Sequence, residues 1–173
     1  MNKNKEIFLL EYLYELSICS RTPEETTKIG NVIGQTANAG DLILLRGQLG
    51  TGKTCLTQGI LWGLGGTEYA RSPTFVLMAQ YEARMTLYHI DLYRIGSIEE
   101  LENLGLEEVI FGEGLTVVEW AERSGDLFIE NGLNIEISYD GTDSRIMNVH
   151  TNNERYSNTI QSIKHSVEFV DSE

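Results

Sequence analysis

Hydrophobic and polar positions along the chain follow two periods, one typical of strands and one typical of helices. Residues 7–18 partly alternate between apolar and polar side chains, which predicts a strand. A helix start follows: the Thr22 hydroxyl can cap it, Pro23 suits its first turn, and Glu25 completes a capping box. Apolar residues then recur at helical spacing, and we expect this helix to end near Gly40.

The middle of the chain predicts a mixed sheet. Residues 41–46 form a short apolar run of buried-strand length, and residues 55–64 carry apolar side chains at helical spacing. Residues 75–81 and 85–93 both have strand character and are separated by a short turn, which predicts an antiparallel hairpin. Residues 47–54, between the strand at 41–46 and the helix at 55–64, match the glycine-rich phosphate-loop pattern G-x-x-x-x-G-K-[ST]. An all-parallel nucleotide-binding sheet would have a crossover helix in place of the hairpin. The sequence therefore predicts an α/β protein with a P-loop NTPase-like three-layer fold and a mixed parallel and antiparallel central sheet.

The remaining chain adds two short helices, three strands and a tail. We expect one domain over residues 1–152, because no linker or internal repeat divides them. Residues 153–173 form a polar tail with weak helical periodicity, and the pattern leaves open whether it is helical or partly disordered. The predicted helices are residues 97–104 and 106–111, and the predicted strands are residues 115–118, 133–139 and 144–149.

Between the strand at 41–46 and the helix at 55–64 lies a phosphate-binding motif. Residues 47–54 match the pattern G-x-x-x-x-G-K-[ST] at every fixed position. Such a loop lets successive N–H groups surround phosphate oxygens, with a helix N-terminus behind them. Lys53 would reach the β- and γ-phosphates, and the Thr54 hydroxyl would contact Mg²⁺. The alternative is an ordinary glycine-rich turn before a helix. The predicted nucleotide contacts in the loop are Leu49, Gly50, Thr51, Gly52, Lys53 and Thr54.

Two acidic residues at strand ends are candidates for the rest of the site. Glu119 ends the strand at 115–118 in a Walker B-like position, and Asp91 ends another apolar strand. Ligands of open α/β sheets gather at the carboxyl ends of strands, so both acids could lie beside the phosphates. Either could instead cap a helix or be a solvated turn residue. Residues 72–74 could close over the γ-phosphate or simply be a proline-shaped loop. We expect His89 to be a packed or hydrogen-bonded strand residue and not a base.

Composition restricts the function classes. The formal net charge is −13, from 26 acidic and 13 basic residues, so the chain has no overall basic surface for direct strong binding of nucleic acid. Cys19 and Cys55 do not form a disulfide framework and fit a reducing compartment. No apolar run is long enough to span a membrane, and the charged N-terminus is a poor signal peptide. We therefore expect a cytoplasmic protein.

Four motifs in this order resemble the bacterial TsaE family, also called YjeE. They are the loop at residues 47–54, Ser72-Pro73-Thr74-Phe75, Tyr88-His89-Ile90-Asp91-Leu92-Tyr93-Arg94, and Val118-Glu119-Trp120. The loop alone is generic, but its combination with the other three motifs is specific. The resemblance covers residues 20–150.

The resemblance implies a function and a set of site residues. It implies a small ATPase needed to make threonylcarbamoyladenosine at position 37 of tRNA, with ATP and Mg²⁺ as cofactors. The partners would be TsaB and TsaD, and the chain would contact tRNA only indirectly, through the complex with these partners. Lys53, Asp91 and Glu119 match catalytic positions, with Thr54 and Glu119 associated with the metal. Pro23 matches a segment close to the nucleotide.

Alternatives and two departures from the family pattern accompany this resemblance. One departure is the tail beyond about residue 150, which is longer than the family needs. The turn at residues 140–143 has no arginine where relatives often place a basic residue near the nucleotide, and Arg145 is the nearest substitute. A P-loop small-molecule kinase is an alternative, although the chain has no arginine-rich cluster for a second substrate. A nucleotide-gated binding module is another. A GTPase would need an N-K-x-D motif after a strand, and the sequence has none.

Overall fold

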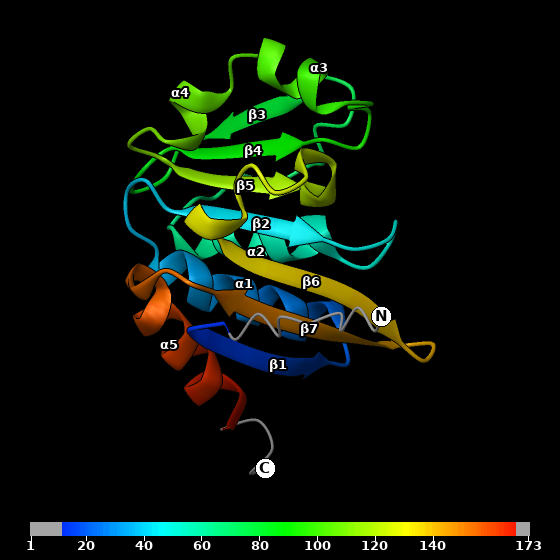
Figure 1. The fold of residues 1–173 in the computed structure, drawn as a ribbon. Helices are drawn as coiled ribbons and strands as arrows, with labels where there is room; N and C mark the ends of the chain where they lie inside the picture. The colour runs from blue at the N-terminus through cyan, green and yellow to red at the C-terminus, as the bar shows by residue number, and fades with distance from the viewer. Residues whose placement is uncertain (1–11, 169–173) are drawn as a thin grey trace, which may run out of the picture.

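The computed structural model describes residues 12–168 of the chain. One seven-stranded sheet crosses the molecule in the order β1-β7-β6-β2-β5-β4-β3 (Figure 1). β2 pairs in parallel with β5 and β6, and β4 pairs in parallel with β5. The other three pairings are antiparallel. The prediction of a mixed sheet is confirmed. The strands are β1 (Tyr14–Ser20), β2 (Leu42–Arg46), β3 (Met78–Tyr81), β4 (Leu87–Asp91), β5 (Leu115–Glu119), β6 (Leu133–Asp140) and β7 (Ser144–Thr151).

Helices cover both faces of this sheet. One face packs against α1 (Pro23–Thr36), α2 (Lys53–Gly63) and α5 (Ser157–Glu168). The other face packs against the shorter α3 (Ile98–Asn103) and α4 (Glu107–Ile110) and the 3-10 turns that follow β5. Alternate residues of β2 divide between the two faces, as expected for a strand buried on both sides. The result is the three-layer α/β arrangement that the sequence predicts.

Four glycines bring α1 and α2 into close contact. Gly30 and Gly34 on α1 face Gly59 and Gly63 on α2, and each pair is spaced by one helical turn. A Cβ atom on Gly34 would lie 2.1 Å from the carbonyl oxygen of Ile60, so no other residue fits without moving a helix. This packing holds the start of α1 beside the loop that precedes α2.

The starts of β1 and β3 differ most from the predicted ones. The predicted N-terminal strand covers residues 7–18, and the observed β1 is Tyr14–Ser20; residues 7–11 lie outside the described part of the chain. The prediction of a strand from residue 75 is wrong for its first three positions. The N–H groups of Val76 and Leu77 both donate to the carbonyl of Pro73, which closes a turn there. β3 therefore begins only at Met78.

Residues 153–168 pack against the sheet. Tyr156 is buried, its hydroxyl accepts a hydrogen bond from the Leu42 N–H at 2.9 Å, and burial raises its pKa to about 12. Arg155 forms a 2.8 Å ion pair with Asp41 at the start of β2. Ile160 and Ile163 of α5 are buried against the sheet core. The predicted boundary between residues 1–152 and 153–173 stays a prediction.

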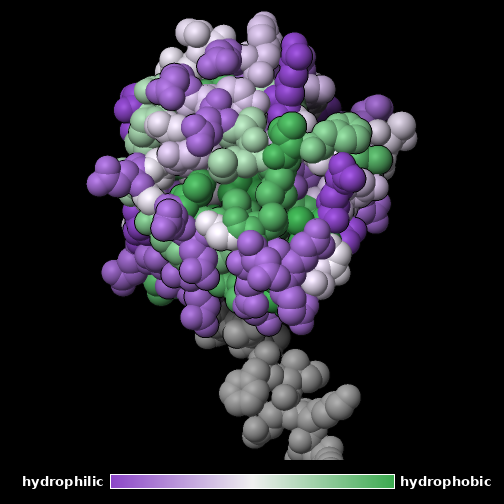
Figure 2. All heavy atoms as spheres, turned by 90° about the horizontal axis from the view of Figure 1, so that it is seen from above, coloured by the Kyte–Doolittle hydropathy of each residue, from purple (hydrophilic) through white to green (hydrophobic). Residues whose placement is uncertain are grey.

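The end of the molecule that carries β3, α3 and α4 has an apolar surface. Figure 2 looks onto this end and shows apolar side chains in a hollow with hydrophilic side chains around it. Leu104 is 40% exposed and Phe111 is 56% exposed. A small cleft of about 130 Å³ between α3, α4 and the following turns is lined in part by Phe111 and Leu127.

Candidate functional site

The glycine loop connects β2 to α2 and has the conformation that phosphate binding needs. Gly52 precedes the first residue of α2 at φ 109°, in the left-handed region that a side chain would strain. Gly47 has φ 136°, and a Cβ atom there would lie 2.2 Å from the carbonyl oxygen of Ile137. The backbone therefore turns tightly between the strand and an 11-residue helix, whose N-terminus attracts anions.

Lys53 is a buried cation in this loop. Its ammonium donates to the carbonyl oxygens of Gly47 at 2.6 Å and Gln48 at 2.9 Å, and it lies 4.0 Å from the ring centroid of Trp120. Burial lowers the pKa of Lys53, and the negative charges of Glu119, Glu122 and Asp91 oppose that shift. The lysine thus reaches the space above the loop, where it can meet an anion.

Glu119 is held by groups on two neighbouring elements. Because β5 lies directly beside β2, the end of β5 comes next to the start of α2. The Thr54 hydroxyl donates to Glu119 Oε2 at 3.1 Å, and His89 Nε2 lies 2.8 Å from Glu119 Oε1. His89 is fully buried on β4, and its Nδ1 has no hydrogen-bond partner within the described residues. Both carboxylate oxygens of Glu119 are therefore fixed in direction.

Asp91 stands beside Glu119 but contacts a different part of the chain. The parallel register of β4 and β5 pairs these two residues directly. Asp91 Oδ2 accepts hydrogen bonds from the Ser72 and Thr74 hydroxyls, the second at 2.6 Å. Asp91 Oδ1 accepts from the Tyr93 N–H at 2.8 Å. Asp91 therefore attaches the loop before β3 to the carboxyl end of β4.

These groups surround a hollow of about 420 Å³ above the glycine loop. Its size is within the range of small-molecule sites. Trp120 closes one side: its backbone is in the left-handed region at φ 59°, and its ring packs 4.9 Å from that of Tyr93. A non-glycine residue in this region carries strain, and such strain is often found at functional sites. The lining residues include Leu49, Gly50, Gly52, Lys53, Thr54, Ser72, Thr74, Asp91 and Glu119.

A smaller hollow of about 120 Å³ lies on the other side of the loop, against the start of α1. Pro23, Thr51 and Arg145 line it, and the guanidinium of Arg145 lies 4.4 Å from the ring centroid of Tyr139. The Tyr139 hydroxyl donates to the carbonyl oxygen of Leu49 at 2.8 Å. The two hollows share loop residues, so one extended ligand could occupy both.

Comparisons with known proteins identify the family. The family model described as "Threonylcarbamoyl adenosine biosynthesis protein TsaE" matches residues 20–147. The chain belongs to the TsaE family. The recognition made from the motifs is thereby confirmed.

Individual TsaE proteins extend the comparison. The tRNA threonylcarbamoyladenosine biosynthesis protein TsaE of Bacillus subtilis is 40% identical over 124 residues, which cover 71% of this chain and 77% of that protein. The protein of the same name from Treponema pallidum is 43% identical over 104 residues, 60% of this chain and 77% of that protein. The crystal structure of Bacillus subtilis YdiB is 30% identical, with a TM-score of 0.76 over 88% of this chain and 96% of that chain. The predicted P-loop NTPase-like fold is confirmed by this likeness.

Every site residue predicted from the sequence lies on one of the two hollows of this TsaE chain. The larger hollow has most of the loop together with Asp91 and Glu119, and the smaller hollow has Pro23 and Thr51. Arg145, the proposed substitute for a basic nucleotide contact, also lies on the smaller hollow. Their chemical roles stay predictions.

Several residues of the site were not predicted, among them Ser20, Thr26 and Tyr139. Ser20 and Thr26 line the smaller hollow, and their buried hydroxyls are 2.8 Å apart. Thr26 could have been found, because a polar residue on the inner face of an otherwise apolar helix needs a partner. Tyr139 has no comparable signal, since it lies at a strand end 90 residues from the loop it contacts.

Thr54 and Glu119 fit a magnesium ion. Mg²⁺ prefers hard oxygen ligands and usually takes one or two carboxylates together with substrate phosphates. Thr54 Oγ1 and Glu119 Oε2 are such oxygens and already lie 3.1 Å apart at the mouth of the loop. Among residues 12–168, no group of three or more His, Cys, Asp or Glu side chains could hold a metal ion. In the same part of the chain, no helix is long and apolar enough to cross a membrane.

Proposed function

We propose that this chain is a Mg-dependent ATPase subunit in the biosynthesis of threonylcarbamoyladenosine at position 37 of tRNA. The contact that carries the proposal is the 3.1 Å hydrogen bond from Thr54 to Glu119 at the mouth of a phosphate-binding loop. It brings together the two oxygen donors that an ATPase of this fold needs beside the phosphates. The names of the TsaE relatives supply the pathway.

The residues would divide the work of hydrolysis. The loop N–H groups and Lys53 would bind the β- and γ-phosphates, and Thr54 with Glu119 would hold Mg²⁺, which neutralises developing charge when bound. Water would attack the γ-phosphorus as the bond to the bridging oxygen breaks, giving ADP and phosphate. Asp91 would fix the loop at residues 72–77 over the γ-phosphate or orient the water.

The binding partners would be TsaB and TsaD, and the chain would contact tRNA only indirectly, through this complex. The net charge of −13 supports this division, because an acidic chain is a poor direct ligand for a polyanion. We place the protein in the cytoplasm, where the free thiols Cys19 and Cys55 would stay reduced.

The test combines a pull-down with an enzyme assay. Purified protein is incubated with TsaB and TsaD, with and without ATP and Mg²⁺, and phosphate release and tRNA modification are measured. We expect slow hydrolysis alone, stimulation by the pair, and loss of both activities in Lys53→Ala and Glu119→Ala. Lys164→Ala, an exposed lysine on α5, is the matched control.

Two outcomes would replace the proposal by an alternative. If assembly and modification survive both Lys53→Ala and Glu119→Ala, the chain is a nucleotide-gated or passive binding module. If mass spectrometry finds phosphate transferred to an acceptor other than water, the chain is a P-loop kinase.

A further inference from the structure

The apolar cleft between α3, α4 and the turns after β5 is separate from the nucleotide site. This α3–α4 cleft is lined by residues 101–102, 106–107, 111 and 127–128. Within residues 12–168, it shares no lining residue with either hollow at the glycine loop. Leu101 and Phe128 form its floor, since they are 3% and 7% exposed. Figure 2 looks onto this end of the molecule, where apolar side chains lie in a hollow.

The walls of the α3–α4 cleft leave large apolar side chains in contact with water. Phe111 is 56% exposed and Leu127 is 43% exposed. The Phe111 ring packs edge-on against the ring of Phe128, with 6.2 Å between the centroids. Ile98 and Leu104 at the two ends of α3 are also exposed, at 42% and 40%. Single exposed apolar residues are ordinary, but a group of them around a hollow marks an interaction site.

The size of the α3–α4 cleft fits a side chain better than a metabolite. Its volume is about 130 Å³, below the range of about 300–1,000 Å³ that is typical of small-molecule sites. Protein interfaces are often held by an aromatic or aliphatic side chain that fills a small pocket of this kind. Covering the exposed walls would also remove apolar surface from water, which stabilises a complex.

The surface around the α3–α4 cleft is acidic. Residues 98–130 contain ten acidic residues and one basic residue. Glu102 and Glu107 border the cleft and are exposed, and among residues 12–168 neither carboxylate has a hydrogen-bond or ion-pair partner. The one base, Arg123, donates to the carbonyl oxygen of Ile95 at 3.3 Å. This field favours a basic partner and disfavours the phosphates of nucleic acids and anionic membranes.

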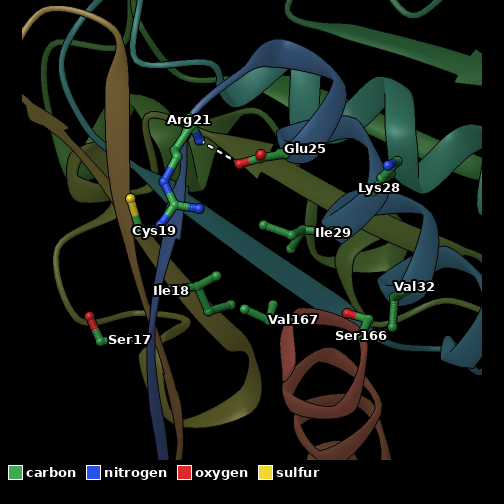
Figure 3. A pocket seen from close by; sticks show the side chains of 10 residues that line it. All are labelled: Ser17, Ile18, Cys19, Arg21, Glu25, Lys28, Ile29, Val32, Ser166 and Val167. Carbon is green, nitrogen blue, oxygen red and sulfur yellow. Dashed lines mark hydrogen bonds between the residues drawn. The ribbon is translucent and has the colours of Figure 1, made fainter. Parts of the chain in front are cut away.

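The cavity between β1, α1 and α5 differs from the α3–α4 cleft in its charges. Its volume is about 270 Å³, and side chains of both signs border it: Arg21, Glu25 and Lys28 (Figure 3). That cavity therefore selects no sign of charge in a ligand. The charged residues that line the α3–α4 cleft are acids alone. A second copy of this chain is a poor complement for them, because the chain carries 26 acidic and 13 basic residues.

We propose that the α3–α4 cleft is a docking site for a basic amphipathic segment of another protein. An apolar side chain of that segment fills the space between Phe111 and Leu127. Its Lys or Arg side chains face Glu102 and Glu107. The docking site does not depend on the proposed function, because the cleft is separate from the nucleotide hollows.

Three synthetic peptides probe the docking site. The test peptide carries Leu and Phe on one helical face and Lys on the other. One control peptide has Glu in place of Lys, and the other has Ser in place of Leu and Phe. Amide chemical shifts of the ¹⁵N-labelled full chain are followed by NMR without nucleotide. We expect saturable shifts with the test peptide that centre on residues 98–111 and 126–130.

Both control peptides should bind at least about tenfold more weakly than the test peptide. The Glu peptide brings like charges together, and the Ser peptide has no side chain to fill the cleft. Equal binding of the Lys and Glu peptides would overturn the proposal. Shifts that centre on another part of the chain would also overturn it.

Two pairs of variants locate the binding. Phe111→Ser removes an apolar wall and should weaken binding of the test peptide about tenfold. Tyr69→Ser removes an aromatic ring that is 72% exposed outside the cleft and should have no effect. Glu107→Lys should weaken binding about fivefold, the upper range for an exposed ion pair. Glu68→Lys makes the same charge change at an exposed position outside the cleft and should have no effect.

The variant pairs decide independently of each other. If Phe111→Ser fails to fold, Glu107→Lys and Glu68→Lys still test the site. Unchanged affinity for the test peptide in a folded Phe111→Ser, or equal affinity in Glu107→Lys and Glu68→Lys, would overturn the proposal.

Sedimentation tests the other possible occupants. We expect the wild-type chain to sediment like Phe111→Ser at all concentrations and to remain free of phosphatidylglycerol vesicles. Self-association that Phe111→Ser abolishes would assign the cleft to a second copy of the chain. Vesicle binding that Phe111→Ser abolishes would assign it to a lipid surface. Either result would overturn the proposal of a basic protein partner.

Discussion

Glu119 and Asp91 end two adjacent parallel strands and face one another in register, yet they are held in different ways. Glu119 contacts Thr54 at the start of α2 and His89 within β4, so both of its partners belong to regular elements. Asp91 contacts Ser72 and Thr74, which lie on an irregular loop. The site therefore has two parts. The fixed part is Glu119 with Thr54 and His89, and the loop-dependent part is Asp91 with Ser72 and Thr74.

The loop held by Asp91 has the features of a movable segment. Leu77 ends it at φ 68°, an unfavourable conformation for a branched side chain. Phe75 is 88% exposed and Val76 is 71% exposed, so the tip makes few contacts with the rest of the molecule. Hydrogen bonds to Asp91 are therefore a main restraint on the loop, and loops of this kind often close over substrates.

The largest effect should follow from changing Glu119. Glu119→Gln keeps the size of the side chain but removes its charge, so we expect ATP hydrolysis to fall about 100- to 1000-fold, as when one preorganised electrostatic contact is lost. Binding of ATP without Mg²⁺ should change little, because the loop and Lys53 are intact. Phosphate release and binding of a fluorescent analogue measure the two effects. Hydrolysis within a factor of two of wild type would remove Glu119 from the fixed part of the site.

Asp91→Asn should have the next largest effect, through the loop. An amide can accept fewer hydrogen bonds than a carboxylate, and bonds to a charged group contribute about 1.5–3 kcal/mol. We therefore expect hydrolysis to fall about 10- to 100-fold and amide exchange to rise at residues 72–77. Glu119→Gln serves as the control, since it should leave exchange in this loop unchanged. Equal exchange in the two variants would show that Asp91 does not hold the loop.

The fixed part of the site was predictable from the sequence, and the loop contacts were not. Residues 47–54 and Glu119 could be placed because a strand, a glycine loop and an acid at the next strand end follow general rules of α/β sheets. The contacts of Asp91 with Ser72 and Thr74 depend on the turn that Pro73 closes, which replaced three predicted strand residues. At residues 75–77 the chain forms a turn, although these residues have high strand propensity.

The packing between α1 and α2 was also not predicted from the sequence. Gly30, Gly34, Gly59 and Gly63 are spaced four apart on two helices, and this spacing could have indicated close packing. The chain reveals each pair separately but not that the pairs face each other. The contact of Tyr156 was equally unpredictable, because its hydroxyl accepts a hydrogen bond from the N–H of Leu42, which lies 114 residues earlier in the chain.

His89 should affect the fixed part of the site alone. Its Nε2 contact with Glu119 orients the carboxylate, and groups that orient a metal-binding residue usually affect metal affinity about tenfold or more. His89→Leu should thus weaken Mg²⁺ binding about tenfold, measured by the Mg²⁺ dependence of hydrolysis and by Mn²⁺ titration of the ADP complex. His89→Gln, which keeps a donor, should recover part of the loss. If both variants lose stability equally but bind Mn²⁺ like wild type, His89 is only a core residue.

The smallest effect should come from the loop hydroxyls taken singly. Ser72→Ala removes one of two hydroxyl donors to Asp91 Oδ2, and Thr74 still holds the loop. One hydrogen bond contributes about 0.5–1.5 kcal/mol, so we expect hydrolysis to fall about threefold. Combining Ser72→Ala with Thr74→Val should approach the effect of Asp91→Asn, because the carboxylate then has no loop donor. If the double variant instead hydrolyses ATP like wild type while Asp91→Asn does not, Asp91 acts on water or metal directly, and the two strand ends are more alike than their contacts indicate.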